Sequence, residues 1–261
     1  MVRATRRRVW LRVFLPVALL IVWYLATTFA PTSPYTPRPV RVLTAFEVLV
    51  GNGALLTAIP ISLGRVLLGF LLASATAALV GLLMGYYPVV EQTLDPLIES
   101  CRSVAPIALL PLAILWFGTG SPAAVFIVSY AAFFPMILNA VAGVRRVSMS
   151  MVRVARTIGA SEWTIMHQVI LPGALPAVLT GARLAMGAAW TSVVAAELAV
   201  GAKAGGGGTG GIGQLMFTFY LYNTDPNPIV ASMIVVGVIG FALDQMIRLL
   251  SRRLIPWAQR S

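Results

Sequence analysis

Residues 61–86, ISLGRVLLGFLLASATAALVGLLMGY, are apolar almost throughout and decide the class of fold. A hydrocarbon core about 30 Å thick is crossed by roughly 20 apolar residues in a helix, because backbone amides facing lipid must be bonded within their own segment. The whole chain has the same character: 59% of its 261 residues are hydrophobic, only 10% are charged, and the mean hydropathy is +0.89. The sequence therefore predicts an all-helical, polytopic membrane protein.

Six membrane spans are expected along the chain. They cover residues 11–29, 61–86, 104–117, 122–141, 178–200 and 229–250. The third span is short and contains Pro106 and Pro111, so we expect it to be kinked, tilted or partly covered by its neighbours. The first span follows a basic head, but it is as long as a full crossing and runs into Pro31 rather than a small-residue cleavage site. A retained helix is therefore expected instead of a secretory signal.

The basic residues predict the sidedness of these spans. With the amino terminus inside, the inner segments hold Arg3, Arg6, Arg7, Arg8, Arg12, Arg102, Arg145, Arg146, Arg153, Arg156, Arg248, Arg252, Arg253 and Arg260. The outer connections hold only Arg38, Arg41 and Lys203. This asymmetry follows the positive-inside rule and predicts that both termini are cytoplasmic. It also accounts for much of the formal charge of +11, so nucleic-acid binding has no separate support.

We expect residues 1–261 to form a single transmembrane domain. Residues 1–30 hold the first span, and residues 31–60 an outer segment with a short surface helix over 42–56. Residues 61–250 form a core of five spans with a cytoplasmic loop at about 145–176, and residues 251–261 form a cytoplasmic tail. Glycine dominates residues 201–213, an outer connection where backbone freedom suits a flexible link.

The most informative pattern lies in the cytoplasmic segment 151–176, MVRVARTIGASEWTIMHQVILPGALP. Apolar residues recur at helical spacing before and after Gly159, which predicts two short amphipathic helices. Gly159 can adopt the left-handed conformation that ends the first helix, and Ser161 can cap the second with Glu162 in its first turn. Pro172 is expected to end that second helix.

So small a helix pair needs a further surface for its apolar faces, and the expected surface is another protein. In the alternative interpretation, Gly159 and Pro172 only punctuate a loop, and the apolar faces pack on the protein itself. Both interpretations agree with the spacing alone.

The same segment is similar to the cytoplasmic loop motif of ABC importer permeases, Glu-Ala-Ala-x3-Gly-x9-Ile-x-Leu-Pro. The matching residues are Ala155, Gly159, Val169, Leu171 and Pro172, whereas Arg153 and Val154 replace the first Glu and Ala. The resemblance implies that the loop docks on a separate ATPase and converts its closure into helix movement. The residues expected to couple to that ATPase are Arg153, Ala155, Gly159, Ala160, Ser161, Glu162, Leu171 and Pro172.

Two further runs resemble the nitrate, taurine and aliphatic-sulfonate branch of that family, the binding-protein-dependent transport inner membrane components. One run is Asp95-Pro96-Leu97-Ile98-Glu99 with Trp116-Phe117-Gly118-Thr119-Gly120; the other is Ala195-Ala196-Glu197. The resemblance implies a type I ABC importer permease fold in a bacterial inner membrane. It also implies a second permease copy, two ATP-binding subunits that carry ATP and Mg, and an extracellular or periplasmic substrate-binding protein.

Under this resemblance the chain is a translocation subunit, holds no cofactor of its own and is not an enzyme. The implied substrate is a small anionic solute of the taurine, alkanesulfonate or nitrate kind. Two alternatives remain open at this point: the scaffold component of a vitamin-type importer, and an intramembrane enzyme. The enzyme would need convergent catalytic groups, which the sequence does not offer.

Ionisable residues within the spans suggest a translocation pathway or a gate. Arg65 begins the second span from the outer side and Glu197 nears the outer end of the fifth, so a structural or gating ion pair is one hypothesis. In the other, each side chain extends to its own interface. Arg183, about 21 Å along the helix from Glu197, could meet an anionic substrate, a lipid phosphate or a helix end.

The remaining pathway candidates are Trp116, Asn139, Trp190, Thr191 and Ser192. The hydroxyl and amide side chains among them could equally form hydrogen bonds between packed helices. His167 has no accompanying cysteine or histidine, so no metal site is expected. The run Gly208-Thr209-Gly210-Gly211-Ile212-Gly213 matches a dinucleotide fingerprint only formally, because no strand precedes it. Glu91, Asp95 and Glu99 are interpreted as a solvated helix face rather than a binding site, with Glu99 paired to Arg102.

Overall fold

The computed structural model describes residues 2–29, 35–203, 210–222 and 225–255. Every regular element within these ranges is helical. The first half of the chain forms α1 (Val2–Phe29), α2 (Pro39–Gly51), α3 (Ala54–Tyr86), α4 (Pro88–Arg102), the 3₁₀ turn η1 (Pro106–Leu109), α5 (Leu110–Phe117) and α6 (Ser121–Arg145). The second half forms α7 (Met149–Thr157), α8 (Glu162–Ile165), the π-helical segment η2 (Met166–Ile170), α9 (Leu171–Lys203), α10 (Ile212–Tyr222) and α11 (Asn227–Leu254).

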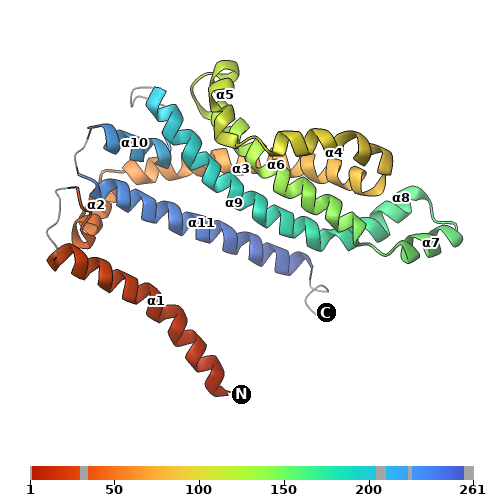
Figure 1. The fold of residues 1–261 in the computed structure, drawn as a ribbon, viewed down its shortest axis with the longest axis horizontal. Helices are drawn as coiled ribbons and strands as arrows, with labels where there is room; N and C mark the ends of the chain where they lie inside the picture. The colour runs from red at the N-terminus through yellow and green to blue at the C-terminus, as the bar shows by residue number, and fades with distance from the viewer. Residues whose placement is uncertain (1, 30–34, 204–209, 223–224, 256–261) are drawn as a thin grey trace.

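The helices α3, α6 and α9 form the centre of the bundle, with α6 packed against both of the others. Glycines permit the close approach: a Cβ atom on Gly69 would lie 2.6 Å from Cγ1 of Val128, and one on Gly181 would lie 2.7 Å from Cβ of Asn139. Small residues at helix contacts are the usual solution in membranes, where packing drives association. Helix α11 lies along α9, and α2 closes one end of α11 (Figure 1).

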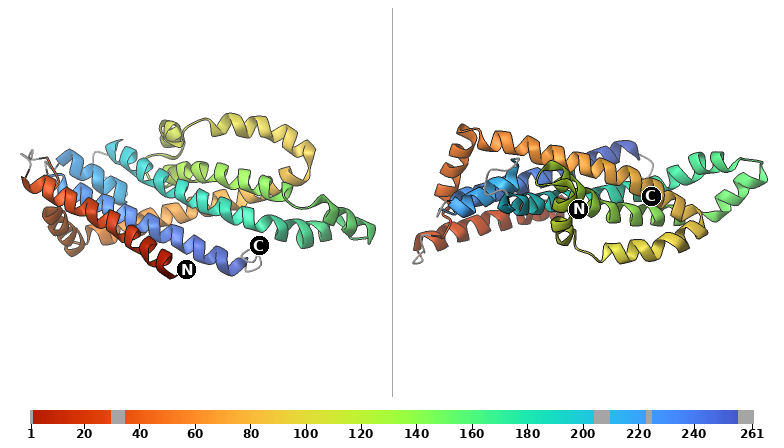
Figure 2. Two further views of the ribbon diagram at one scale, coloured as in Figure 1. Left: turned by 60° about the horizontal axis from the view of Figure 1, so that its bottom comes forward. Right: turned by 90° about the horizontal axis from the view of Figure 1, so that it is seen from above.

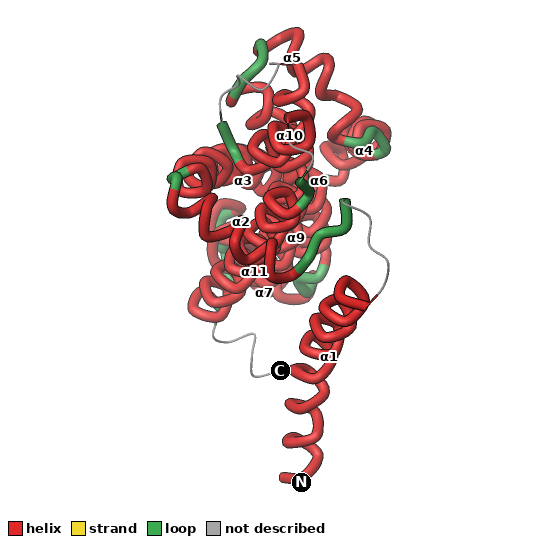
Figure 3. The backbone as a smooth tube through the Cα atoms, turned by 90° about the vertical axis from the view of Figure 1, so that its left-hand side faces the viewer, coloured by secondary structure: helices red, strands yellow, loops and turns green. Residues whose placement is uncertain are grey.

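The two ends of the bundle differ. Helices α7 and α8 project beyond the central helices at one end, whereas α2 and α10 gather at the other (Figure 1). Helix α4 folds back from the end of α3 along the outside of the bundle (Figure 2). Helix α1 leans away from the packed helices (Figure 3), and Nε1 of Trp23 donates a hydrogen bond to the carbonyl of Pro37, 3.2 Å away.

Four described helices are long and apolar enough to cross a membrane: α3, α6, the continuous segment Glu162–Val200, and α11. They contain the predicted spans 61–86, 122–141, 178–200 and 229–250. Within the residues searched, the apolar part of α1 is Val17–Phe29. The predicted surface helix over 42–56 is instead α2, which ends at Gly51 before α3 begins at Ala54.

The third predicted span, residues 104–117, does not form a crossing helix by itself. Helix α4 and the η1–α5 segment pass the length and apolarity test only as a pair, and they are bent by 86° at the break between them. Ala105 is extended, with φ −63° and ψ 132°, because a residue that precedes proline is disfavoured in the helical region. Pro106 therefore starts a new turn in a new direction.

The predicted helix end at Pro172 is also wrong, because the chain continues from α8 through η2 into α9. A proline inside a helix removes one hydrogen bond, and its ring clashes with the carbonyl four residues earlier, which here is Gln168. Gln168 lies in the π-helical segment Met166–Ile170, where wider hydrogen bonding relieves that clash. The loop is thus joined to α9 without a break.

Candidate functional site

The loop between α6 and α9 has the predicted local geometry. Gly159 has a φ of +80°, and its amide donates a hydrogen bond to the carbonyl of Arg156 at 3.0 Å, which closes α7. The hydroxyl oxygen of Ser161 accepts a hydrogen bond from the amide of Thr164 at 3.2 Å, so it caps α8. Glu162 occupies the first turn of that helix. The left-handed conformation of Gly159 and the cap at Ser161 are confirmed.

One face of this helix pair is buried by the protein itself. Val152 on α7, Ile165 on α8 and Ile170 on η2 pack with Val144 and Ala174 in a small core of their own. The alternative interpretation, in which the apolar faces pack on the protein, holds for this face. Through Val144 and Ala174, this small core attaches the loop to the end of α6 and the start of α9.

The opposite face is open. Met151, Val154 and Ile158 of α7 are 63%, 62% and 78% exposed. Together with Val169 and Pro172 they line an apolar groove of about 590 Å³. The loop therefore presents an unburied apolar surface that points away from its own core.

The expected coupling residues lie on and beside this surface. Ala155 on α7 and Ala160 in the turn before α8 are half-buried against the loop's small core, and Arg153 is exposed on α7. Leu171 and Pro172 form the first residues of α9 and are half-buried.

A polar contact ties the loop to the end of α3. Nε of Arg156 lies 3.0 Å from Oε1 of Glu162, and its Nη2 lies 3.1 Å from the hydroxyl of Tyr86, which itself contacts Glu162. The carboxylate of Glu162 and the phenol of Tyr86 raise the pKa of the Arg156 guanidinium, because both accept its hydrogen bonds. Nearby, Arg145 of α6 pairs with Glu91 of α4. Tyr86 was not among the residues predicted for this site, since no local pattern relates it to Glu162, 76 positions later.

At the opposite end of the bundle, Arg65 and Glu197 form an ion pair. Nη1 of Arg65 lies 2.7 Å from Oε1 of Glu197, and both side chains are buried. The hydroxyl of Ser62 is 2.9 and 2.8 Å from the two carboxylate oxygens, and the amide of Gly213 donates to Oε2 at 3.0 Å. The pairing hypothesis is confirmed; its role in gating stays a proposal.

This buried polar cluster also holds the start of α10. Arg65 donates to Oγ of Ser121 at 3.1 Å and to the carbonyl of Gly210 at 2.9 Å, and the amide of Ile212 donates to Oγ of Ser62 at 2.9 Å. A Cβ atom on Gly211 would lie 2.3 Å from Oε1 of Glu197. Glycine at position 211 is therefore required by this close approach. Helix α10 itself was not predicted, and residues 204–209 of the glycine-rich connection lie outside the described residues.

Arg183 pairs with Asp244, a partner that was not among the predicted ones. Its Nε and Nη2 lie 2.5 and 2.8 Å from the two carboxylate oxygens of Asp244 on α11. Trp190 is buried in the same α9–α11 contact, where its Nε1 donates to the carbonyl of Val236 at 3.0 Å. A Cβ atom on Gly240 would lie 2.9 Å from that indole ring.

The remaining pathway candidates come from three different helices, α5, α6 and α9. Asn139 donates to the carbonyl of Pro135 at 2.7 Å, and Thr191 bonds to the carbonyl of Gly187 at 3.1 Å, so both contact their own helices. Trp116 is exposed on α5 with its ring edge toward Phe126, and Ser192 is half-buried on α9. Among the pathway candidates, Arg65 and Glu197 are joined by an ion pair.

Other expectations concern metal and acidic residues. Among the described residues, no group of three or more His, Cys, Asp or Glu side chains could hold a metal ion. The ring of His167 lies 4.1 Å from that of Trp163, measured between centroids. The predicted pair between Glu99 and Arg102 is present, with Oε1 and Nη2 2.6 Å apart.

Membrane-length helices, a projecting helix pair at one end and a buried ion pair at the other define a polytopic membrane protein. A chain of the inward-facing MetNI methionine ABC transporter has the same fold, with a TM-score of 0.63 at 17% identity, over 77% of this chain and 95% of that one. Residues 77–256 match the family of binding-protein-dependent transport system inner membrane components, and the chain belongs to this family.

Similar proteins of this kind come from several bacteria. The taurine transport system permease TauC of Escherichia coli is 35% identical, over 96% of this chain and 90% of TauC. The putative aliphatic sulfonates transport permease SsuC of Bacillus subtilis is 32% identical, over 97% and 89%. The nitrate import permease NrtB of Leptolyngbya laminosa is 30% identical, over 85% and 80%. The resemblance to this branch of ABC importer permeases is confirmed.

Proposed function

We propose that this chain is the membrane-spanning subunit of an ATP-driven importer for a small anionic solute, a sulfonate such as taurine or a nitrate-like oxoanion. Relatives named for taurine, aliphatic sulfonates and nitrate support the substrate class. Membership of a binding-protein-dependent family supports an external soluble binding protein, and it favours this assignment over a vitamin-type scaffold. Two copies of the chain would work with two ATPase subunits that carry ATP and Mg, with both termini in the cytoplasm.

The observation that carries this proposal is the open apolar face of the loop. Met151, Val154 and Ile158 are exposed, although the other face of the same short helices is buried. An apolar surface that stays exposed outside the membrane marks a site where a partner binds. An ATPase docked on this groove would push on α7, and the continuous path through η2 into α9 would carry that movement into the bundle.

At the outer end, the buried polar cluster of Arg65, Glu197, Ser62 and Gly213 is proposed to work as a gate. It joins α3, α9 and the start of α10 through hydrogen bonds that would have to break together. Movement of α9 from the cytoplasmic end would strain this cluster and release α10. Solute delivered by the binding protein would then enter the bundle.

The docking proposal is tested by placing a charge in the groove. Val154→Asp would bury an unpaired carboxylate against the ATPase, at a cost of several kcal/mol. We expect binding of the cognate ATPase in a pull-down, and uptake in proteoliposomes, to fall at least tenfold. Thr157→Asp is the matched control, because Thr157 is exposed on the same helix but does not line the groove. Full association and uptake with Val154→Asp would exclude docking on this face.

A further inference from the structure

The ion pair between Arg183 and Asp244 lies within the membrane-spanning part of the bundle. Both residues fall inside the predicted spans 178–200 and 229–250. Measured from Leu171 at the start of α9 and from Leu254 at the end of α11, the pair is about 15–18 Å along these helices. This distance places the two charges in the hydrocarbon core, deeper than the headgroups.

The same pair is not enclosed by its own chain. The side chains of Arg183 and Asp244 are 41% and 36% exposed. Charged side chains at this depth are stable in a bundle interior or beside a water-filled cavity, because lipid solvates them poorly. The exposed surface around this pair is therefore unsuited to lipid.

The other exposed residues of α9 share one face with Arg183. Between residues 174 and 200 the exposed positions recur at spacings of three and four, and they are Thr180, Arg183, Leu184, Gly187 and Thr191. Leu184 is the one large apolar side chain among these five. The exposed face of α3 differs, because leucines dominate it, with Leu67, Leu68, Leu71, Leu72 and Leu79. Helix α3 thus has a lipid-facing surface, whereas this face of α9 is polar or small.

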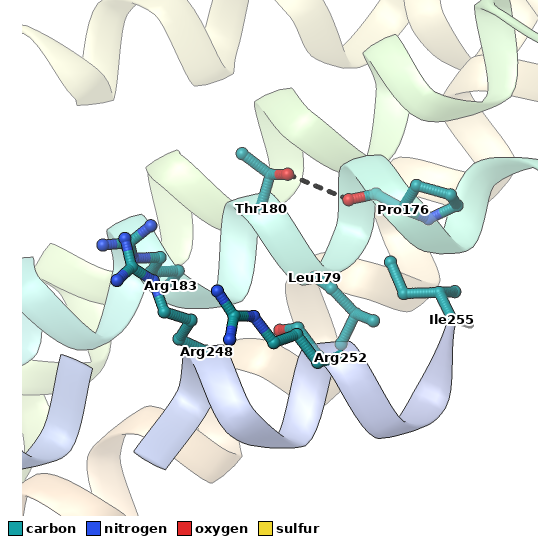
Figure 4. A pocket seen from close by; sticks show the side chains of 8 residues that line it. Pro176, Leu179, Thr180, Arg183, Arg248, Arg252 and Ile255 are labelled. Atoms are coloured by element: carbon teal, nitrogen blue, oxygen red, sulfur yellow. Dashed lines mark hydrogen bonds between the residues drawn. The ribbon is translucent and has the colours of Figure 1, made fainter. Parts of the chain in front are cut away.

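The polar face of α9 is open on both sides of the ion pair. On the side of the cytoplasmic loop, a groove of about 210 Å³ lies between α9 and α11, and its lining includes Thr180, Arg183 and Arg248 (Figure 4). On the other side, a Cβ atom on Gly187 would meet nothing within 4 Å. Water can therefore reach the pair along α9 without crossing a packed contact of this chain.

We propose that this face of α9 lines the cytoplasmic half of a water-filled solute pathway, and that Arg183 contacts the anion there. The inference rests on the proposed function for the anionic substrate and for the cytoplasmic side of the loop. Asp244 accepts hydrogen bonds from Nε and Nη2 of Arg183, which leaves Nη1 for an oxygen of a passing sulfonate or nitrate. The adjacent carboxylate also keeps anion binding weak, as a pathway requires for release.

The first test measures water access with single cysteines in the assembled transporter. Cys101, the one cysteine of the chain, is replaced by alanine, and Thr180→Cys, Gly187→Cys and Thr191→Cys are made one at a time. Leu71→Cys is the matched control, because Leu71 is 61% exposed on the leucine face of α3. A charged methanethiosulfonate that does not cross the bilayer is added from the cytoplasmic side, and its reaction rate is measured.

We expect the three α9 positions to react about tenfold faster than the α3 control, since the reactive thiolate forms only where water reaches it. Rates as slow as that of the control would overturn the proposal. They would mean that lipid, or a dry contact with a second copy of the chain, covers this face.

The second test examines the charge of Arg183 with Gly187→Cys as the reporter. The measured quantity is the reaction rate of an anionic sulfonate reagent divided by that of a cationic trimethylammonium reagent. We expect this ratio to fall about fivefold with Arg183→Gln, to rise about fivefold with Asp244→Asn, and to return near its original value in the double variant. Arg183→Lys should preserve it. An identical ratio in every variant would exclude a contact between Arg183 and the anion.

The readouts keep this inference apart from the proposed function. Cysteine reactivity is measured without ATP, whereas uptake of taurine and nitrate is measured on the unchanged transporter. Normal ATP-driven uptake with an unreactive α9 face would overturn the pathway assignment alone. A reactive, charge-sensitive α9 face without ATP-driven uptake of either anion would overturn the proposed function alone.

Discussion

Nη1 of Arg65 lies 2.7 Å from Oε1 of Glu197, although the two residues are 132 positions apart in the chain. Both side chains are buried, and the pair joins α3 to α9. Removal of one partner from a buried pair leaves an uncompensated charge, whereas removal of both does not. Comparing single variants with the double variant therefore distinguishes a structural role of the pair from a gating role.

Glu197→Ala should destabilise the protein by about 3–5 kcal/mol, because Arg65 would stay buried without its carboxylate. Glu197→Gln should cost less, since its amide oxygen, placed where Oε2 lies, can still accept hydrogen bonds from Ser62 and Gly213. Thermal unfolding in detergent measures both values. Equal stability of Glu197→Ala and the unchanged chain would contradict the buried pair.

The double variant Arg65→Met with Glu197→Leu should recover most of the stability lost in the single variants. If the pair is a gate, uptake in proteoliposomes should nevertheless stay low or become uncoupled from ATP hydrolysis. Normal, ATP-coupled uptake by the double variant would assign the pair to structure alone.

Gly211→Ala should disrupt the same cluster from the side of α10. Its Cβ atom would lie 2.3 Å from Oε1 of Glu197, and the backbone φ of +111° is unfavourable for alanine. We expect a melting temperature several degrees lower than that of the unchanged chain. Gly51→Ala is the control, because nothing lies within 4 Å of its Cβ position. Similar melting temperatures for the two variants would argue against a tight α10 contact.

Gly159→Val should weaken coupling, because a β-branched residue is strained at a φ of +80° by about 1–2 kcal/mol or more. Gly159→Asn is the matched control, since asparagine tolerates the left-handed region and nothing lies within 4 Å of the Cβ position. Uptake and ATPase association should fall with valine and largely persist with asparagine. If uptake fell equally with valine and with asparagine, the loss would be caused by side-chain size and not by the left-handed conformation at this position.

Tyr86→Phe and Glu162→Gln should lower uptake per ATP hydrolysed by similar amounts, because both weaken the contact between the loop and α3. The double variant should be little worse than either single variant, since the two changes affect one contact. Tyr87→Phe is the control, as the neighbouring tyrosine shares the location. Additive losses would show that the two residues act independently.

Local features of the sequence predicted much of this protein. The apolar runs around residues 61–86, 122–141 and 229–250 lie within α3, α6 and α11, because a helix in lipid must bond its own backbone. The hinge at Gly159 and the cap at Ser161 are likewise local, since each depends on the conformation of a few adjacent residues.

Contacts between distant segments depended on the assembled fold. Proline-rich residues 104–117 are apolar enough to suggest a span, yet their direction is set by the break at Ala105 and by packing against α6. Pro172 reads locally as a helix end, but the π-helical segment before it lets the helix continue. The partners of Arg183 and Arg156 lie on other helices, so only the packing of those helices brings Asp244 and Tyr86 within hydrogen-bond distance. The periodicity of one segment does not show which residue of another helix lies beside it.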